Sequence, residues 1–362
     1  MKRKKIAFII PSLETGGAER VVSSLANELI DDFDVTIIAY YNCTPFYKLD
    51  ERIDFQFCKI DYIKGENSLM THFQLFTRTY KILKSKKINL VIGFMSTANI
   101  YAIVSSKLLR IPNIISERSN PNYNDISNFW VKLRRLIYPY ANKLVIQTNG
   151  IKDYFNDIIN EEQFETIKNP LAKDLILKRD LNSIKDKLIL NVGRLSPSKN
   201  QDLLIKAFAN IDHKDWKLII VGEGEFKKEL SRLIDFYKLE DKVILIGNEP
   251  NVSKYYNTAS IFAFTSKHEG FPNVLTEALY FGLPTISTNC SFGPSELIND
   301  LENGFLIPVG DQIQLEEKLK ILMTDSDLRK KFSNNAINST VNFEGTKISL
   351  KWKSLITKLL NA

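Results

Sequence analysis

Two glutamates with seven residues between them could bind a ligand rich in hydroxyl groups. Glu269 follows an apolar run at residues 261–264, and Glu277 lies about one turn into a helix that Pro272 or Asn273 starts. Carboxylates accept hydrogen bonds from sugar hydroxyls, and the positive end of a helix dipole favours both charges. We therefore expect Glu269 to hold a sugar and Glu277 to lie where a ribose binds. Charges that only cap a helix are the alternative.

A loop that contains glycine and proline carries two cations five residues apart. Arg194 and Lys199 follow an apolar run at residues 188–192, and Gly193 directly precedes Arg194. An arginine fork and a lysine point charge from one loop suit a diphosphate, whose charge grows as it leaves a breaking bond. Such a pair would stabilise the transition state without a metal ion. Two solvated surface cations are the alternative.

Two further loops place glycines after an apolar run. Gly16 and Gly17 precede an expected helix, and Gly222 begins a Gly-Glu-Gly turn. Glycine lets the backbone approach a ligand closely, and a helix start presents free N–H groups to a phosphate. Both loops lack the third glycine of the dinucleotide-binding fingerprint, so a tight turn from strand to helix is an equally good interpretation of the first loop. We expect the second to line a pocket.

The elements that must position these loops alternate between short apolar strands and amphipathic helices. The expected strands are residues 6–10, 35–40, 90–94, 113–116 and 144–147, followed by 188–192, 218–221, 243–246, 261–264 and 285–287. Such alternation predicts parallel sheets covered by helices on both faces. The predicted fold class is therefore α/β, with two Rossmann-like domains.

A polar stretch divides this pattern into two domains. We predict an N-terminal domain at residues 1–168, a linker at 169–186, a C-terminal domain at 187–343 and a last helix within 344–362 that packs back on the N-terminal domain. In open parallel sheets, ligands bind beyond the carboxyl ends of the strands. Two such domains facing each other predict one deep cleft.

Composition indicates the class of partner and the compartment. The net charge of +7 is carried more by lysine than by arginine, which favours phosphate-bearing ligands or anionic lipid. Cys43, Cys58 and Cys290 lack metal-ligand spacing and indicate a reducing cytoplasm. The uncharged run at residues 88–106 approaches membrane-spanning length, but polar residues interrupt it, and we predict a strand, a loop and a helix.

Several motifs, in this order along almost the whole chain, resemble the retaining glycosyltransferases of family 4, which have the GT-B fold. The motifs are the glycine pair Gly16-Gly17, Gly193-Arg194 with Lys199, Glu269 to Glu277, Gly282-Leu283-Pro284 and Gly293-Pro294-Ser295-Glu296. The spacing of the two glutamates is the most specific of them. Further segments are similar to bacterial enzymes that add N-acetylhexosamine, above all N-acetylgalactosamine, to oligosaccharides on polyprenyl diphosphate. These segments are residues 16–20, 46–49, 116–120, 133–140 and 278–282.

The resemblance implies a role for each matching residue. Gly17 would offer its N–H to the distal phosphate, Arg194 and Lys199 would hold the diphosphate, Glu269 the donor sugar and Glu277 the ribose. The other residues implied at the donor site are Gly16, Gly193, Gly222, Gly270, Phe271 and Asn273. The donor is expected to be UDP-GalNAc, with no cofactor. In this class the leaving phosphate itself takes the acceptor proton.

One position departs from the family. Many members carry a histidine near the sugar and the acceptor, after the fourth or fifth strand of the first domain. This sequence has Glu117 and Arg118 there. Either side chain could replace the histidine, and we expect Glu117 to take a catalytic part and Arg118 to contact the acceptor.

Two acidic pairs and three histidines are weaker candidates. Metal-dependent transferases place an acidic pair at a strand end, but Asp32 and Asp34 precede a strand, and Asp325 and Asp327 lie between terminal helices. We therefore expect no metal site. Of the histidines, only His268 adjoins a candidate residue.

A basic helix is predicted at residues 69–87. Its apolar stripe is expected to comprise Leu69, Phe73, Phe76, Tyr80 and Leu83. Arg78, Lys81 and Lys84 would lie along one flank, where they could hold the diphosphate of a lipid-linked acceptor or anionic headgroups. We accordingly expect a cytoplasmic protein at the inner face of the membrane. An ordinary surface helix is the alternative.

Two other functions fit the same fold class. One is a nucleotide-sugar epimerase or a phosphorylase, and the other is a basic nucleotide-binding module without catalysis. The sequence lacks a nucleic-acid motif, and its aromatic residues are not interleaved with basic ones, so we expect no nucleic acid partner.

Overall fold

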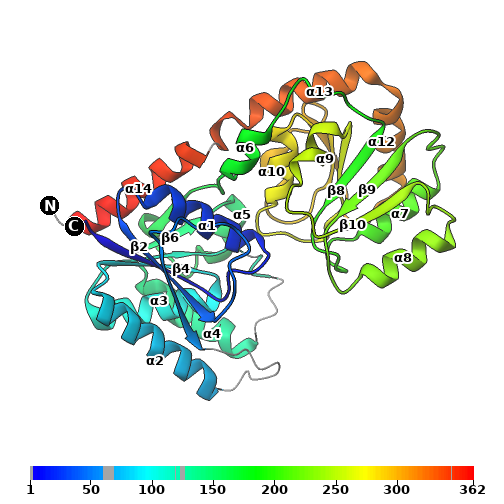
Figure 1. Cartoon of the computed structure of the whole chain (residues 1–362). Helices are drawn as coiled ribbons and strands as arrows, with labels where there is room; N and C mark the ends of the chain where they lie inside the picture. Colours follow the sequence, from blue (N-terminus) through cyan, green and yellow to red (C-terminus); the bar gives the residue numbers. More distant parts are fainter. Residues whose placement is uncertain (1–2, 60–68, 119, 123–126, 344) are drawn as a thin grey trace. The chain divides into compact units, whose positions relative to one another are not determined.

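The computed structural model describes residues 3–59, 69–118, 120–122, 127–343 and 345–362. The chain forms two compact units (Figure 1). Unit 1 comprises residues 1–172 and 345–362, and unit 2 comprises residues 173–344. The chain thus leaves unit 1 inside the segment expected to be a linker, and its last helix returns to unit 1.

Unit 1 contains a parallel sheet of seven strands in the order β3-β2-β1-β4-β5-β6-β7. The strands are β1 Lys5–Ile10, β2 Asp34–Tyr41, β3 Asp54–Lys59, β4 Leu90–Phe94, β5 Asn113–Ser116, β6 Lys143–Ile146 and β7 Phe164–Thr166. The α-helices are α1 Gly17–Leu29, α2 Leu69–Lys86, α3 Ser96–Leu109, α4 Asn128–Ile137, α5 Asn149–Phe155 and α14 Gly345–Asn361. Strands buried on both faces explain the continuous apolar runs of the sequence.

The helices of unit 1 bury both faces of its sheet. Ile6, Phe8 and Ile10 of β1 pack in one cluster with α1 and α14, while the alternate side chains Ala7 and Ile9 are also fully buried. Figure 1 shows α14 lying along α1, and α2, α3 and α4 form a separate packed group. α14 is thus part of the packed core of unit 1.

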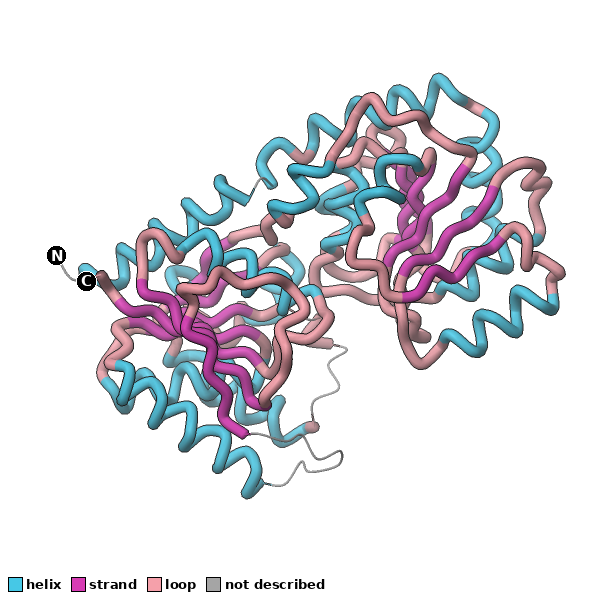
Figure 2. Tube along the Cα trace, in the orientation of Figure 1, coloured by secondary structure: helices cyan, strands magenta, loops and turns pink. Residues whose placement is uncertain are grey.

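Unit 2 contains a parallel sheet in the order β10-β9-β8-β11-β12-β13. The strands are β8 Leu188–Val192, β9 Lys217–Val221, β10 Val243–Gly247, β11 Ile261–Phe264, β12 Thr285–Thr288 and β13 Gly304–Ile307. The α-helices are α6 Lys173–Lys178, α7 Gln201–Ala209, α8 Lys227–Phe236, α9 Ser253–Thr258, α10 Asn273–Tyr280, α11 Pro294–Leu297, α12 Gln312–Thr324 and α13 Ser326–Ser339. Figure 2 shows the strands flanked by helices, so the predicted α/β class with parallel sheets is confirmed.

Three strands were not expected from the sequence. β3 and β7 are the two edges of the sheet in unit 1, and β13 is an edge in unit 2. An edge strand has fewer buried neighbours and needs no continuous apolar run. β3 accordingly alternates polar and apolar residues, and β7 has three residues. The run at residues 88–106 forms β4 and α3, as predicted, and none of the helices in the described residues is long and apolar enough to cross a membrane.

The two acidic pairs have structural roles. Asp32 accepts a hydrogen bond from Lys353 of α14, and Asp34 lies 3.7 Å from the guanidinium of Arg3. Asp325 caps α13 by accepting from the backbone N–H of Leu328 at 2.8 Å. Among the residues that the structure describes, no group of three or more His, Cys, Asp or Glu side chains could hold a metal ion.

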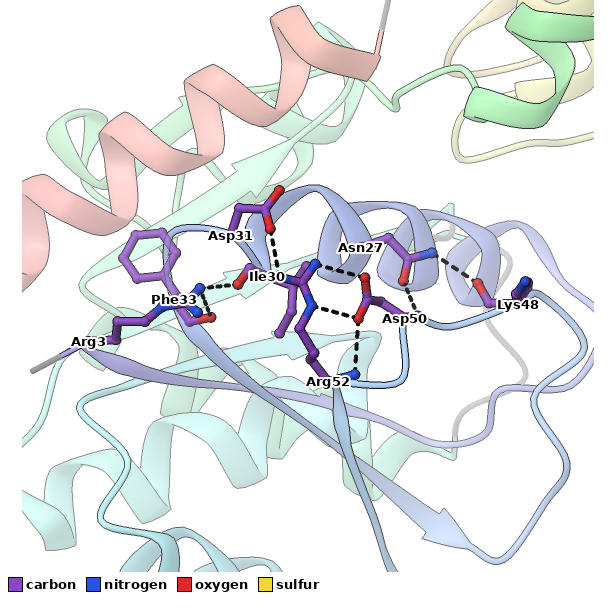
Figure 3. Close-up of polar contacts among 8 residues, drawn as sticks. All are labelled: Arg3, Asn27, Ile30, Asp31, Phe33, Lys48, Asp50 and Arg52. Atoms are coloured by element: carbon purple, nitrogen blue, oxygen red, sulfur yellow. Dashed lines mark hydrogen bonds and ion pairs between the residues drawn. The ribbon is translucent and has the colours of Figure 1, made fainter.

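A polar network ties the loop before β3 to α1 (Figure 3). Arg52 donates two hydrogen bonds to the Asp50 carboxylate, at 2.9 and 2.8 Å, and a third to Asp31 at 2.8 Å. Asn27 of α1 accepts from the backbone N–H of Asp50 and donates to the carbonyl of Lys48. The hydrogen bonds from Arg52 hold the pKa of Asp50 below its usual range.

The network predicts a pH-dependent stability. The folded-state pKa of Asp50 lies below its unfolded value, so the stabilisation is present above pH of about 4 and is lost as the pH falls further. Asp50→Asn is expected to lower the Tm at pH 7, and the difference from the native protein should shrink by pH 3. The effect is small because the pair is exposed. Thermal unfolding at both pH values measures it, with Glu51→Gln as control, and a difference that does not change with pH would contradict the assignment.

Candidate donor and acceptor sites

The candidate residues of unit 2 lie where its strand order reverses. β8 pairs with β9 on one side and with β11 on the other, so the chain winds outward in both directions from these two central strands. Such a switch point leaves a crevice at the carboxyl ends of the strands, where open parallel sheets bind ligands. Arg194 and Lys199 follow β8, and Glu269 follows β11. The topology therefore brings the predicted cations and the first glutamate to one edge.

The loop after β8 is fixed by the loop after β9. Gly222 has a φ of 150°, and a Cβ there would lie 1.9 Å from the carbonyl oxygen of Gly193. A Cβ on Gly224 would likewise lie 2.1 Å from the carbonyl oxygen of Leu195. The backbone N–H of Leu195 donates to the carbonyl of Glu223 at 2.9 Å. Gly222, expected at the donor site, thus has a structural reason to be glycine: it lets two loops pack backbone to backbone.

The two predicted cations differ in their surroundings. The Arg194 side chain is exposed, and no ion pair to it occurs within the described part of the chain. Its carbonyl accepts a hydrogen bond from the buried Gln201 at 3.0 Å, which holds the backbone of the loop. Lys199 is half-buried and donates to the Glu269 carboxylate at 2.5 Å. The loop therefore presents one exposed guanidinium beside one ammonium that is already paired.

The pair formed by Lys199 and Glu269 joins the loops after β8 and β11. Their side chains are 26% and 11% exposed, so both are largely shielded from water. Thr265, directly after β11, donates to the carbonyl of Lys199 at 3.0 Å, and the N–H of Lys267 donates to Ser198 at 2.8 Å. The sequence placed these residues in the same site, but it did not predict that they bind each other.

The second glutamate is positioned by a tyrosine that the sequence reasoning missed. Glu277 lies in α10, which begins at Asn273 after Pro272, as predicted. Its side chain is 3% exposed, and Tyr256 donates its hydroxyl to the carboxylate at 3.0 Å. Tyr256 comes from α9 and stacks on Phe281 with ring centroids 5.2 Å apart. Nothing in the sequence pattern marks a tyrosine so far from Glu277 along the chain.

The loop after β12 packs against the start of α10. Gly293 has a φ of 112°, and a Cβ there would lie 2.4 Å from Cδ of Pro272. Phe292 adopts a φ of 64°, a left-handed conformation that is strained for a bulky residue. Burial raises the pKa of the nearby Cys290 thiol to about 12, with a smaller contribution from the charge of Glu269. The thiol is therefore an inert part of the packing.

The remaining candidates of unit 2 form the backbone between the two glutamates. Gly270 and Phe271 are buried, and the ring of Phe271 lies 6.4 Å from that of Phe343. Asn273 is half-buried at the first position of α10, and His268 is half-buried next to Glu269. Phe271 therefore packs inside unit 2, whereas Asn273 lies partly exposed at the start of α10.

In unit 1 the predicted glycine pair starts α1. Gly17 is exposed at the first position of the helix, and Gly16 is its N-cap. A Cβ on Gly16 would lie 2.0 Å from Oε2 of Glu19, so the Glu19 carboxylate lies directly over this backbone. β1 also neighbours β4 at the switch point of unit 1. The pair therefore lies where an open sheet binds ligands, and a carboxylate already occupies the space beside Gly16.

Glu117 does not have the position expected of a catalytic group. Its side chain is fully buried directly after β5. Ser96 donates to it at 3.1 Å, Tyr138 donates at 2.8 Å, and the buried guanidinium of Arg134 lies 4.0 Å away. These contacts close the carboxylate off from an acceptor, so the structure gives Glu117 a structural role in place of the catalytic one.

Arg118 is half-buried beside the last helix. Its guanidinium lies over Phe94 at 4.7 Å and over Trp352 of α14 at 6.0 Å, and it donates to Asn169. Burial lowers the pKa of Arg118 to about 9, and the charge of Glu117 opposes this shift. Of the two residues in the place of the family's histidine, Arg118 alone retains exposed surface. Its contact with an acceptor stays a prediction.

The basic helix forms as predicted, but its buried face differs. Arg78, Lys81 and Lys84 are exposed on α2, and Arg78 donates to the carbonyl of Cys58. The buried residues of α2 are Thr71, Leu75, Thr79 and Leu83. Leu69 and Phe73 of the expected apolar stripe are 72% and 62% exposed. The apolar stripe of the helical pattern and the buried face of α2 therefore share Leu83, and the buried face also contains two threonines.

Comparisons with known proteins match a glycosyltransferase family model in each of the two units. A model described as Glycosyltransferase Family 4 matches residues 15–174, and one described as Glycosyl transferases group 1 matches residues 174–339. A Campylobacter jejuni protein is 33% identical over 367 residues, covering 99% of this chain and 99% of its own. It is named GalNAc-alpha-(1->4)-GalNAc-alpha-(1->3)-diNAcBac-PP-undecaprenol alpha-1,4-N-acetyl-D-galactosaminyltransferase.

Solved structures share the fold of the chain. Sucrose-phosphate synthase from Thermosynechococcus elongatus has a TM-score of 0.84 at 18% identity, covering 99% of this chain and 100% of its own. Anabaena HepE in complex with UDP and glucose has a TM-score of 0.82 at 19% identity, covering 98% of this chain and 100% of its own. The GT-B fold that the motifs implied is therefore confirmed.

The hydrogen bond between Tyr256 and Glu277 predicts a cost in stability. Tyr256→Phe leaves the buried carboxylate without that donor, so we expect it to lower the free energy of unfolding by about 1–3 kcal/mol. Urea denaturation measures the change. Tyr255→Phe, at the half-buried neighbouring position, is the matched control. Equal stability of the Tyr256→Phe variant and the native protein would show that the bond contributes nothing.

Proposed function

We infer that this chain, which belongs to glycosyltransferase family 4, moves an N-acetylhexosamine from a nucleoside diphosphate to a glycan on polyprenyl diphosphate. The observation that carries the proposal is the group formed by Arg194, Lys199 and Glu269 at the switch point of unit 2. A guanidinium and an ammonium provide charge for a diphosphate, and a carboxylate beside them provides an acceptor for sugar hydroxyls.

The proposed donor is UDP-GalNAc. The Campylobacter jejuni relative is named as an N-acetylgalactosaminyltransferase, and HepE, which shares the fold, was solved with UDP. In unit 2, the diphosphate would contact Arg194 and Lys199, and the ribose would contact Glu277. The Tyr256 hydroxyl holds the Glu277 carboxylate in place before the donor arrives. The backbone N–H of Gly17, at the start of α1, is proposed to contact a phosphate.

The proposed reaction replaces one ion pair by two new contacts. The phosphate oxygens would take the Lys199 ammonium from Glu269, and the freed carboxylate oxygen would then accept a hydrogen bond from the sugar. As the bond from the anomeric carbon to the phosphate oxygen breaks, negative charge grows on the diphosphate, and Arg194 and Lys199 would stabilise it. The leaving phosphate would take the proton of the acceptor hydroxyl, and the new linkage would retain the α configuration.

The proposal includes no metal ion and no cofactor. The two side-chain cations of the loop after β8 would supply the charge that a divalent ion supplies in other transferases. The acidic pairs that could suggest a metal site form ion pairs or cap helices instead.

The proposed acceptor is a glycan on polyprenyl diphosphate, as in the name of the Campylobacter jejuni relative. Arg78, Lys81 and Lys84 are exposed on α2 and would contact the diphosphate of this acceptor. Such a substrate would place the protein at the inner face of the cell membrane. The comparisons with transferases favour this function over an epimerase, a phosphorylase or a non-catalytic module.

Nucleotide binding tests the donor site directly. In a thermal-shift panel of UDP, GDP, ADP and their sugars, we expect UDP and UDP-GalNAc to raise the Tm of the native protein, because a ligand present at about 100 times its Kd stabilises by about 2.7 kcal/mol. Arg194→Ala should reduce the shift caused by UDP, and Glu269→Ala should abolish the extra shift caused by the sugar. Arg232→Ala, an exposed arginine of α8, is the matched control. The donor assignment fails if no nucleotide raises the Tm of the native protein.

Acceptor kinetics test the basic helix. The triple variant of Arg78, Lys81 and Lys84 to alanine is expected to raise the KM for a polyprenyl-diphosphate acceptor by on the order of tenfold to a hundredfold, since each basic residue near an anionic lipid contributes about 1 kcal/mol. The shift caused by UDP should not change. A triple variant of Lys347, Lys351 and Lys358 to alanine on α14 removes the same charge elsewhere in unit 1. An unchanged KM in the α2 variant would refute the acceptor contact.

A further inference from the structure

Unit 1 contains an apolar groove between α2, α3 and α4. Its volume is about 200 Å³, more than the roughly 150 Å³ of an apolar cavity that stays dry and binds benzene. Residues from all three helices line it, including Leu69, His72, Phe76, Tyr101, Val104 and Trp130. The rings of His72 and Trp130 meet at 4.5 Å, and those of Phe76 and Tyr101 at 6.0 Å. We call this feature the α2–α4 groove.

The polar atoms described in the groove bond to each other. The Tyr101 hydroxyl lies 2.7 Å from Nδ1 of His72 and also donates to the His72 carbonyl at 3.2 Å. Burial lowers the pKa of His72, so the imidazole is neutral at neutral pH. The walls therefore suit a hydrocarbon better than a sugar or a nucleotide.

The surface around the groove combines apolar and basic side chains. Leu69, Phe73 and Phe129 are 72%, 62% and 51% exposed next to it. The sequences of α2, α3 and α4 contain no aspartate or glutamate. They contain exposed lysines and arginines, which are Arg78, Lys81, Lys84, Lys107, Lys132 and Arg135. This combination complements an amphiphile with an apolar chain and an anionic head.

Part of the groove lies near the carboxyl ends of the strands in unit 1. α2 follows the carboxyl end of β3, and α3 follows that of β4. The groove residues Leu69 and His72 lie in the first turn of α2, and Tyr101 lies in the first half of α3. An apolar chain in the groove would therefore lie beside the edge at which unit 1 is expected to receive its acceptor.

We propose that the α2–α4 groove binds an isoprenoid segment of the lipid carrier to which the acceptor glycan is attached. This inference rests on the proposed function, which supplies a polyprenyl diphosphate as the carrier. A concave groove that is formed by three helices holds one chain at a time, whereas a bilayer surface would contact only the outward side chains such as Leu69 and Phe73. The basic residues of the same helices would attract the diphosphate at the head of that chain.

Quenching of Trp130 fluorescence tests the groove on the full chain. Trp130 lines the groove, while Trp216 and Trp352 are buried at 5% and 0% exposure. A farnesyl diphosphate that carries a nitroxide at the end of its chain should quench the native protein but not Trp130→Phe. Unlabelled farnesyl diphosphate should reverse the quenching, whereas methyl diphosphate should not. Displacement by methyl diphosphate at equal concentration would overturn the proposal, since the head alone would then be bound.

Two variants test the walls of the groove. Val104→Phe fills it and should weaken binding of the labelled probe at least tenfold, and the exposed Leu350→Phe of α14 is the matched control. If Val104→Phe does not fold, Phe129→Ala, which removes a half-exposed wall residue, should weaken binding at least threefold. Native affinity in the folded groove variants would overturn the proposal.

Further outcomes separate the possible ligands and the two proposals. Displacement of the probe by phosphatidylglycerol vesicles that contain no isoprenoid would overturn the proposal in favour of a membrane surface. Quenching at Trp130 that depends on the chain, together with no transfer of sugar to any lipid-linked glycan, would support the groove and refute the proposed function.

Discussion

Parallel pairing of the strands is the constraint on which the rest of this structure depends. When all strands run the same way, every loop that follows a strand lies at one edge of the sheet, and the order β9-β8-β11 places two of these loops on either side of a switch point. Arg194, Lys199 and Glu269 are far apart along the chain, yet this topology alone brings their loops together. The pair formed by Lys199 and Glu269 then fixes the two loops to each other.

The loops of unit 2 are rigid because their backbones interlock. Gly222 lies against the carbonyl of Gly193, and Gly293 lies against Pro272, so neither glycine can be replaced without moving a second loop. Hydrogen bonds between side chains then position groups that the backbone does not hold, as the Tyr256 hydroxyl does for the Glu277 carboxylate. Positioned groups of this kind lose little entropy when a ligand binds. Arg194 is the contrasting case. Gln201 holds its backbone carbonyl by a hydrogen bond, whereas its guanidinium is exposed.

The sequence predicts elements and order well because both depend on local pattern. Buried parallel strands such as β4 and β11 are continuous apolar runs, and the start of α10 follows from Pro272 and Asn273. The edge strands β3 and β7 were missed because an edge imposes no such run. The buried face of α2, which includes Thr71 and Thr79, does not follow from its apolar stripe, because a single-helix pattern contains no information on neighbouring elements.

Residue positions were predictable only where they depend on the loop that carries the residue. Arg194 and Glu269 lie at strand ends, as expected. Position 222 requires glycine because the carbonyl of Gly193, in the loop after another strand, lies too close for a side chain. The ion pair of Lys199 with Glu269 likewise joins two different loops. Periodicity and spacing contain no information on such contacts. For the same reason the sequence did not predict that Glu117 is buried, although this residue follows a strand as a site residue should.

Two buried carboxylates show how the same chemistry can serve structure and function in the two units. Glu117 and Glu277 each accept a tyrosine hydroxyl, at 2.8 and 3.0 Å, although Glu117 directly follows β5 and Glu277 lies in α10. Glu117 also has Ser96 and the buried guanidinium of Arg134 beside it, so its charge is neutralised within unit 1. Removing one partner of such a buried group would leave an uncompensated charge, which is costly. Glu269 has a different arrangement, because it is paired with the Lys199 ammonium, which in the proposed reaction would move to a phosphate. The proposed donor site would therefore differ from the site of Glu117 in containing a charge that can exchange its partner.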